Sequence, residues 1–271
     1  MIIEKAYAKI NLALEVMNVK DGYHMVNNLM VPIDLYDELS FELNDDIELV
    51  NNEYEDNIIL KAAKLFINEF NIKSGVKIKL NKKIPAEAGL GGGSSDAAAT
   101  LRGLNKLFNV NATDDKLLSL ASKLGSDVPF FIKSKLALCT NRGEKVNIIN
   151  KTYKPINILL LKPKTGCSTK AVYNLYKYDG KEKRKIIDEI ITNLERNEIE
   201  KLNNNIFNDL LNPALNVNNE LKEIYNDLKP KTNIQLSGSG STLFIIEPTE
   251  EMKQYINKKY SQLYTLNTKI L

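Results

Sequence analysis

Residues 85–101 read PAEAGLGGGSSDAAATL, a run in which glycines and serines stand directly before a segment that we expect to be helical. Four glycines fall within five positions, and two serines follow: Gly89, Gly91, Gly92, Gly93, Ser94 and Ser95. Ordering such a loop is costly because glycine loses more backbone freedom on folding than any other residue. A phosphate cradle would compensate, since glycines let the backbone approach an anion and a helix N-terminus presents unpaired N–H groups to it. The alternative is a flexible loop that ends in an ordinary helix cap.

The loop matches none of three better-known glycine motifs. A dinucleotide fingerprint requires G-x-G-x-x-G, but Ser94 stands where the third glycine should be. A Walker A loop ends in Gly-Lys-Ser/Thr, and no lysine lies between Glu87 and Arg102. The nucleophile elbow G-x-S-x-G is absent both from this loop and from the second glycine-rich stretch at 236–241. Any phosphate site here therefore belongs to a different class.

The composition of the 271 residues describes a globular protein and excludes several function classes. Hydrophobic residues at 43% and charged residues at 26% are ordinary values for a folded domain. The net charge of +3 is small and the lysines are scattered, which gives little support to nucleic-acid binding. Cys139 and Cys167 form no CxxC pair, which argues against a zinc site or a disulfide scaffold and suits a reducing cytosol.

Nothing in the sequence predicts a membrane segment. The first 16 residues carry charges at Glu4, Lys5 and Lys9 and lack the apolar stretch of a signal peptide. The longest apolar run, INILLL at 156–161, is too short to cross a bilayer and is typical of a buried strand. We expect a cytoplasmic protein without membrane partners.

The order of predicted elements favours an α+β fold with two lobes. Alternation or β-branched enrichment predicts strands near 2–8, 10–18, 25–34, 38–43, 76–84, 156–162, 233–237, 241–247 and 264–271. Helical spacing predicts helices at 59–70, from the glycine loop to about 108, from Thr113 to about Gly125, in several pieces between 168 and 228, and at 249–260. After residue 150 the predicted pattern changes to a buried strand followed by several helices. We therefore expect an N-terminal domain at 1–150 and a C-terminal domain at 151–271.

Three further segments have both a structural and a chemical interpretation. AKINL (8–12) places Lys9 in an alternating strand, where a lysine is ordinarily a solvated edge residue. DGYH (21–24) holds the only histidine of the chain and is also a typical hairpin turn. LGSDVPFF (124–131) places Asp127 before Val128-Pro129, as a carboxylate at a helix start would be. Each segment taken alone favours the structural interpretation.

Taken together, the segments resemble those of the GHMP kinases, a superfamily of ATP-dependent small-molecule kinases. The residues that carry the resemblance are AKINL (8–12), DGYH (21–24), PAEAGLGGGSSDAA (85–98), LGSDVPFF (124–131), RGEKV (142–146), Ser168 and Thr169 with Tyr173, and LSGSGSTLF (236–244). They lie in the family's order and spacing across nearly the whole chain. The resemblance implies an N-terminal α/β lobe with a mixed sheet, a C-terminal ferredoxin-like lobe, and ATP with Mg²⁺ as cofactors. The glycine loop alone specifies only the superfamily, whereas AKINL together with DGYH and LGSDVPFF implies a kinase whose acceptor is a cytidine diphosphate derivative of methylerythritol.

The resemblance also implies roles for individual residues. Asp127 matches the catalytic base and Lys9 the lysine beside it, which would keep the carboxylate ionised and stabilise the developing alkoxide. The phosphate-binding loop corresponds to Pro85, Gly89, Leu90, Gly91, Gly92, Gly93, Ser94 and Ser95, and Asn57 and Lys82 match the adenine side of the ATP pocket. The acceptor residues are Asn11, Tyr23, His24, Thr169 and Tyr173, with both tyrosines stacking on cytosine. Asp96 matches either a helix cap or an indirect magnesium ligand, and we expect no protein-built metal site.

Two alternatives remain at this point. The chain could be another GHMP-type kinase acting on mevalonate or homoserine, although those acceptors offer no base on which DGYH could stack. It could also be a non-catalytic nucleotide- or RNA-binding protein on the same fold, which would not require the pair of Lys9 and Asp127. For the kinase we expect a small-molecule substrate, no nucleic-acid partner, and a monomer or weak homodimer.

Overall fold

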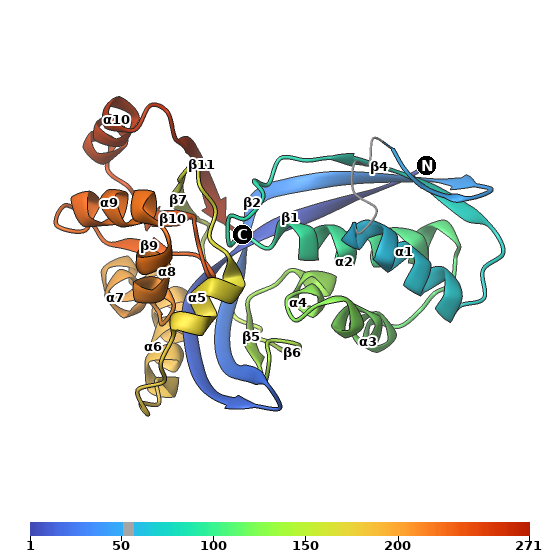
Figure 1. Cartoon of the computed structure of the whole chain (residues 1–271), viewed down its shortest axis with the longest axis horizontal. Helices are drawn as coiled ribbons and strands as arrows, with labels where there is room; N and C mark the ends of the chain where they lie inside the picture. The colour runs from blue at the N-terminus through green and yellow to red at the C-terminus, as the bar shows by residue number, and fades with distance from the viewer. Residues whose placement is uncertain (51–56) are drawn as a thin grey trace.

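The computed structural model describes residues 1–50 and 57–271 and has two lobes joined by a long hairpin (Figure 1). The hairpin consists of β1 (Ile2–Lys20) and β2 (Tyr23–Asn44), which pair antiparallel. Asp21 and Gly22 form its turn with φ of 52° and 80°, which confirms the turn predicted from the Asp-Gly dipeptide. Asp and Gly tolerate this left-handed backbone better than other residues.

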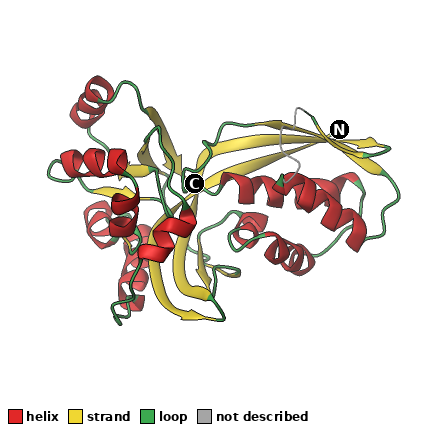
Figure 2. Ribbon diagram, viewed as in Figure 1, coloured by secondary structure: helices red, strands yellow, loops and turns green. Residues whose placement is uncertain are grey.

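The sequence predicted four shorter strands where the structure has two long ones. The pairing shifts register at three points along β1, after Tyr7, Asn11 and Val16. Bulges of this kind break the alternation of side chains and bend a strand pair without ending it. The bent hairpin consequently runs from the first lobe into the second (Figure 2).

In the N-terminal lobe the helices pack on one face of the sheet (Figure 1). The elements are β3 (Ile47–Leu49), α1 (Ile58–Glu69), β4 (Gly75–Asn81), α2 (Gly92–Leu107), α3 (Asp114–Leu124), α4 (Val128–Lys133), β5 (Ala137–Thr140) and β6 (Lys145–Ile148). Phe41 on the sheet and Phe66, Phe130 and Phe131 on the helices are buried in the core of this lobe. Gly103 of α2 lies against Phe41, and a Cβ there would come within 2.4 Å of the ring.

The second lobe contains the rest of the sheet between two layers of helices. Its elements are β7 (Ile156–Lys162), α5 (Thr169–Leu175), α6 (Arg184–Glu195), α7 (Ile199–Asn205), β8 (Phe207–Asn208), α8 (Leu211–Val217), α9 (Asn219–Leu228), β9 (Ile234–Leu236), β10 (Leu243–Ile246), α10 (Glu250–Lys259) and β11 (Tyr264–Ile270). The antiparallel order β11-β7-β10-β9 buries alternate residues of β7 on opposite faces. Ile158 and Leu160 face α6, whereas Leu159 and Leu161 face α8 and α9.

One sheet joins the two lobes in the part of the chain that the structure describes. Its main path runs β3-β4-β2-β11-β7-β10-β9, and Ile33 of β2 pairs with Ile270 of β11 where the lobes meet. A shared core combines residues of the hairpin with residues of β7 and α6. The domain boundary at residue 150 therefore stays a prediction, because packing does not divide cleanly there.

The helix ends agree with most of the predicted caps. Thr113 caps α3 through its side chain, as predicted. Gly125 ends the same helix, close to the predicted end, and its φ of 170° is extended backbone that needs no glycine. Among the described residues, no helix is both long and apolar enough to cross a membrane.

Candidate active site

The glycine loop enters α2 through two residues with left-handed backbone. Gly89 has φ of 71° and Gly91, at the N-cap of α2, has φ of 72°. A Cβ on Gly89 would lie 2.2 Å from the Ser237 carbonyl oxygen, and one on Gly91 would lie 2.6 Å from the Phe131 ring. These two glycines are required by the protein's own packing, whatever the loop binds.

The next two glycines are different because they form the first turn of the helix. A Cβ on Gly92 would lie 3.0 Å from the Lys82 ammonium, whereas one on Gly93 would have no neighbour closer than 3.9 Å. Gly93 is exposed to solvent. The open N-terminus of α2 at Gly92 and Gly93 is where a phosphate can approach the backbone N–H groups.

We expect Gly89→Ala to lower the free energy of unfolding by about 3 kcal/mol, because it adds a backbone clash to an unfavourable φ. Gly93→Ala is the matched control from the same loop. It meets no clash and adds a better helix former, so its free energy of unfolding should stay within about 1 kcal/mol of the parent. Urea denaturation of both variants measures the difference. Equal stability of the two would contradict the packing role of Gly89.

The second glycine-rich stretch, 236–242, packs directly on the first. The Ser237 hydroxyl donates to the Gly89 carbonyl at 2.9 Å, and the Thr242 N–H donates to the Ala88 carbonyl at 3.1 Å. The stretch connects β9 and β10, which pair antiparallel, so it is the turn of a hairpin. The motif both closes a hairpin and supports the phosphate loop.

Lys9 lies buried on β1 beneath this junction. Its N–H donates to the Leu90 carbonyl at 3.0 Å, and its ammonium donates to Asn11 Oδ1 at 2.7 Å. Asn11 Oδ1 also accepts from the Gly238 N–H at 2.7 Å, and its amide donates to Asn28 at 2.6 Å. Burial lowers the pKa of Lys9, and the charge of Asp127 opposes that effect. The lysine is thus held in a fixed position by groups from both glycine stretches and the hairpin.

Asp127 precedes α4, and its side chain makes no capping hydrogen bond there. Its carboxylate is therefore available for chemistry, although Pro129 near the start of α4 confirms the predicted helix entry. Asp127 interacts electrostatically with Lys9 and with Tyr173. No ion pair joins the described side chains of Lys9 and Asp127, so the lysine lies near the carboxylate without contacting it.

Aromatic rings gather around His24, and one of them, Tyr173, interacts electrostatically with Asp127. The His24 ring lies 5.6 Å from Tyr173 and 5.9 Å from Tyr176, measured between ring centroids. His24 Nδ1 lies 3.2 Å from the Met17 carbonyl, which can only accept, so Nδ1 carries the proton and Nε2 is left as the free ring nitrogen. Burial, with a further contribution from Asp127, raises the pKa of Tyr173.

Two of the other predicted acceptor residues lie in different settings. Thr169 is hydrogen-bonded through its hydroxyl to Ser239 at 2.9 Å, which places it at the second glycine stretch. Tyr23 is 55% exposed, with the Arg142 guanidinium 5.0 Å above its ring. Tyr23 therefore lies beside a cation at the surface, whereas Tyr176, which the sequence analysis missed, contacts His24.

Lys82 joins two carboxylates next to the glycine loop. Its ammonium lies 2.6 Å from Asp37 and 2.6 Å from Asp96. The fully buried Asp37 also accepts from the backbone N–H groups of Lys83 and Ile84, at 2.5 and 2.8 Å. Burial, and then the charge of Asp37, raises the pKa of Asp96 to about 7, against the opposing charge of Lys82.

Asp37 was not predicted as a site residue, although the sequence carries a signal for it. Along β2 the inward positions read Leu35, Asp37, Leu39 and Phe41, so a carboxylate occupies an apolar face. A buried charge requires a partner, and this one has a lysine and two N–H groups. Such an inward aspartate in an alternating strand could have been read as part of a polar site.

The remaining predicted ATP residues lie around the start of α1 and α2. Asn57 caps α1 by accepting from the Ile59 N–H at 2.9 Å, a structural role in addition to any contact with a nucleotide. Pro85 and Ser94 are half-buried at the two ends of the loop, and Ser95 is fully buried. The Ser95 hydroxyl and Asp96 Oδ1 are buried without a hydrogen-bond partner in the described structure.

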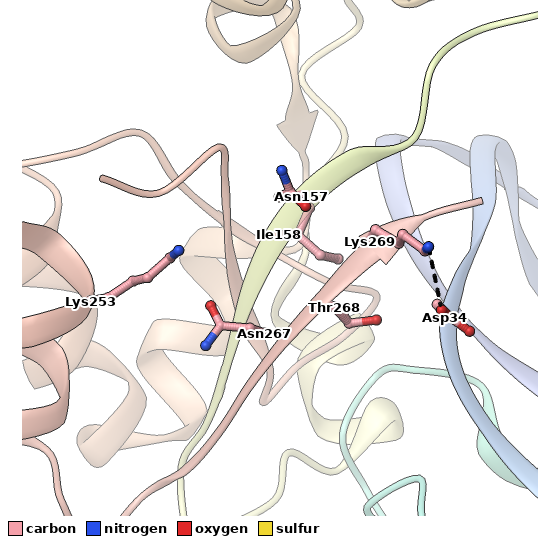
Figure 3. Close-up of a pocket in the computed structure, with 7 residues that line it drawn as sticks. All are labelled: Asp34, Asn157, Ile158, Lys253, Asn267, Thr268 and Lys269. Atoms are coloured by element: carbon pink, nitrogen blue, oxygen red, sulfur yellow. Dashed lines mark ion pairs between the residues drawn. The ribbon is translucent and has the colours of Figure 1, made fainter. Parts of the chain in front are cut away.

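A hollow in the second lobe contains none of the residues predicted for the site (Figure 3). It is lined by Asp34, Asn157, Ile158, Lys253, Asn267, Thr268 and Lys269. Lys269 points toward Asp34, at 3.9 Å, and Lys253 comes from α10. This hollow is open and polar, and it is separate from the junction of the two glycine stretches.

The chain is similar in sequence to known proteins. Residues 57–135 match the family model described as the GHMP kinases N terminal domain. The chain is 39% identical to 4-diphosphocytidyl-2-C-methyl-D-erythritol kinase of Clostridium beijerinckii, over 97% of this chain and 99% of that protein. It is 42% identical to the protein of the same name from Clostridium botulinum, over 89% of each chain. The Clostridium tetani relative, also of that name, is 40% identical over 97% of this chain and 99% of its own length.

Solved structures extend the similarity to the fold. A crystal structure of 4-(cytidine 5'-diphospho)-2C-methyl-D-erythritol kinase superposes with a TM-score of 0.83 at 28% identity, covering 99% of this chain and 98% of its own. Homoserine kinase from Cytophaga hutchinsonii superposes with a TM-score of 0.69 at 16% identity, covering 100% of this chain and 94% of its own. The likeness to homoserine kinase concerns the fold alone.

Proposed function

The chain belongs to the 4-diphosphocytidyl-2-C-methyl-D-erythritol kinases of the GHMP superfamily, and we propose that it transfers the γ-phosphoryl group of ATP to the 2-hydroxyl of that cytidyl alcohol. It is a small-molecule kinase of isoprenoid synthesis. The mevalonate and homoserine alternatives, and the non-catalytic one, are not favoured. A cytoplasmic location and a monomeric or weakly dimeric state stay predictions.

The observation that carries the proposal is that Asp127 interacts electrostatically both with Lys9 and with Tyr173. Lys9 is held next to the glycine loop and is hydrogen-bonded to Asn11. The Tyr173 ring belongs to the aromatic group around His24. A hydroxyl group held near Asp127 would thus face a proton acceptor, a cation and the open end of α2 together.

Each of these groups would supply one part of the transfer. Asp127 accepts the proton of the acceptor hydroxyl as the oxygen attacks phosphorus, and Lys9 stabilises the negative charge that develops on that oxygen. The backbone N–H groups at Gly92 and Gly93 hold phosphate oxygens at the positive end of the α2 dipole. Phosphoryl transfer requires little more than such positioning and charge stabilisation.

The residues beside the loop fit a magnesium ion that arrives with ATP. No cluster of three or more His, Cys, Asp or Glu side chains able to hold a metal exists among the described residues. Ser95 and Asp96 each have a buried oxygen without a partner next to the loop, and Mg²⁺ takes one or two such ligands together with phosphates. Bound there, the ion would neutralise charge on the phosphates while Lys82 keeps Asp96 in place.

The aromatic group would select the cytidyl acceptor. Cytosine has a π-face on which Tyr173 can stack, and its amino group can donate to the free Nε2 of His24. The Arg142 guanidinium occupies one face of the exposed Tyr23 ring, so we assign the main stacking role to Tyr173, which contacts His24.

Tyr173→Ala should weaken binding of the cytidyl acceptor by about 10- to 100-fold, the range expected for one stacked base, and leave ATP binding nearly unchanged. The matched control is Tyr178→Ala, which removes an exposed tyrosine from the same segment. Calorimetric titration of both ligands into each variant makes the comparison. Equal losses for acceptor and ATP would contradict the stacking role.

A panel of acceptors tests the proposed function itself. With ATP and Mg²⁺, we expect turnover of the cytidyl alcohol and none of mevalonate or homoserine above background. Methylerythritol phosphate without the cytidyl group serves as the matched control, because it has the alcohol but nothing to stack. Turnover of mevalonate or homoserine with no turnover of the cytidyl compound would refute the assignment.

A further inference from the structure

We propose that Asn208 and Asp209 are positioning residues, each of which orients a different half of the active site. Asn208 ends β8, which pairs with Ala13 and Leu14 of β1, and Asp209 follows it directly. Neither residue belongs to a motif that the sequence analysis singled out. The inference rests on the proposed function, because it concerns the same reaction.

Asn208 acts on the catalytic half through the second glycine stretch. Its amide donates to the carbonyls of Leu236 and Gly238, at 2.9 and 2.8 Å. The N–H of the same Gly238 donates to Asn11 Oδ1, which accepts the Lys9 ammonium, both at 2.7 Å. A continuous set of hydrogen bonds therefore runs from Asn208 to the catalytic lysine. Without the Asn208 amide, Gly238 loses the contact that sets its distance from Asn11.

Asp209 acts on the acceptor half through β1. Its N–H donates to the Leu14 carbonyl and its Oδ2 accepts from the Val16 N–H, both at 2.9 Å. The Tyr176 hydroxyl donates to the Val16 carbonyl at 2.6 Å and lies 3.3 Å from Asp209 Oδ2. The Tyr176 ring is one of the two that contact His24. Asp209 thus fixes the part of β1 to which Tyr176, a member of the aromatic group around His24, is hydrogen-bonded.

The segment from Tyr176 to Lys183 is held at its second end by the same carboxylate. The Lys183 ammonium forms an ion pair with Asp209 Oδ1. The Lys183 N–H donates to Glu15 at 2.6 Å, and Glu15 is buried and also accepts from Asn27 at 2.7 Å. The loop that begins at Tyr176 is therefore tied down where it starts and where it ends.

The side chains of Asn208 and Asp209 have different hydrogen-bond partners. This difference allows a positioning role to be distinguished from a general contribution to stability. Within the described residues, the hydrogen bonds of the Asn208 side chain go to Leu236, Gly238 and Leu210, and none goes to the aromatic group. Those of the Asp209 side chain go to Val16, Tyr176 and Lys183, and none goes to the second glycine stretch. A merely structural pair would affect all kinetic constants together.

The test is a comparison of kinetic constants in Asn208→Ala and Asp209→Asn. Asn208→Ala should lower kcat by about 10-fold with the acceptor KM within about twofold, because it displaces Lys9 and leaves the pocket intact. Asp209→Asn should raise the acceptor KM by about 10-fold with kcat and the ATP KM within about twofold. Tyr176→Phe, which keeps the ring and removes only the hydroxyl, should raise the acceptor KM in the same direction by about threefold.

Matched controls are Asn233→Ala, which removes an exposed amide hydrogen bond to Asn204, and Asp188→Asn, which removes an exposed ion pair with Arg184. Both should retain the parent kinetics. Parallel changes in kcat and both KM values, no change at all, or an Asn208→Ala variant that does not fold would overturn the inference. A parent enzyme that does not turn over the cytidyl alcohol would instead refute the proposed function, so the two failures are distinguishable.

Discussion

Asp127→Asn is expected to lower kcat by about 1000-fold or more, within the range that a general base contributes. The amide is the same size as the carboxylate and cannot accept the proton of the acceptor hydroxyl. Because the Asp127 side chain makes no capping hydrogen bond to α4, its replacement should not disturb the helix. Single-turnover measurements with ATP and the cytidyl alcohol give the rate of the transfer step directly.

The same variant should bind ATP as the parent protein does, since Asp127 lies outside the glycine loop. Calorimetry with a non-hydrolysable ATP analogue checks this point. Asp115→Asn, in the exposed first turn of α3, is the matched control and should retain full activity. Activity of Asp127→Asn within about tenfold of the parent would remove the carboxylate from the proton transfer.

Lys9→Met should lower kcat by about 100- to 1000-fold, the loss expected when one donor to a developing oxyanion is removed. Methionine retains the length of the side chain and removes the ammonium. Asn11 keeps its hydrogen bond from Gly238, so the neighbouring backbone should stay in place.

The stability of this variant should change in the opposite direction from its activity. Lys9 is 2% exposed and burial lowers its pKa, which means that the folded protein bears the cost of an incompletely solvated charge. An apolar side chain of similar volume removes that cost, so the free energy of unfolding should be unchanged or higher. Lys5→Met, on the exposed part of the same strand, is the control and should retain activity. A variant that loses activity only by unfolding would contradict the role assigned to Lys9.

Local chemistry allowed much of the fold to be predicted. The Asp21-Gly22 turn, the Thr113 cap and the entry of Pro129 into α4 each depend on a few adjacent residues, and all three are confirmed. The strand β7 was visible as the apolar run at 156–161. The length of the hairpin was not predictable, because bulges after Tyr7, Asn11 and Val16 reset the alternation on which strand prediction depends.

The candidate site was predictable in its motifs and less so in its contacts. Lys9, Asp127, His24 and Tyr173 do gather at one junction. The Lys9 ammonium, however, is hydrogen-bonded to Asn11 rather than to Asp127. Asn11 is itself held by the backbone N–H of Gly238, more than 200 positions away in the sequence. No short-range pattern reports such a contact.

The roles of the individual glycines in the loop likewise depend on contacts with residues distant in the sequence. The sequence predicted one role for all four glycines, either a phosphate cradle or a flexible loop before a helix cap. In the structure a Cβ on Gly89 or Gly91 would clash with the protein's own backbone or with the Phe131 ring, whereas Gly92 and Gly93 form the first turn of α2, where Gly93 is open to a ligand. The partners that make this division, Ser237 and Phe131, are distant in sequence, so only the fold could assign the two roles.

The proposed reaction transfers the γ-phosphoryl group of ATP to one hydroxyl of a cytidyl alcohol, the 2-hydroxyl. The most direct measurement is phosphorus and proton NMR of the product formed with ATP, Mg²⁺ and 4-diphosphocytidyl-2-C-methyl-D-erythritol. We predict one equivalent of ADP for each equivalent of product, with the new phosphate attached to the 2-hydroxyl oxygen. A phosphate on any other hydroxyl, or ADP released without a phosphorylated acceptor, would contradict the account.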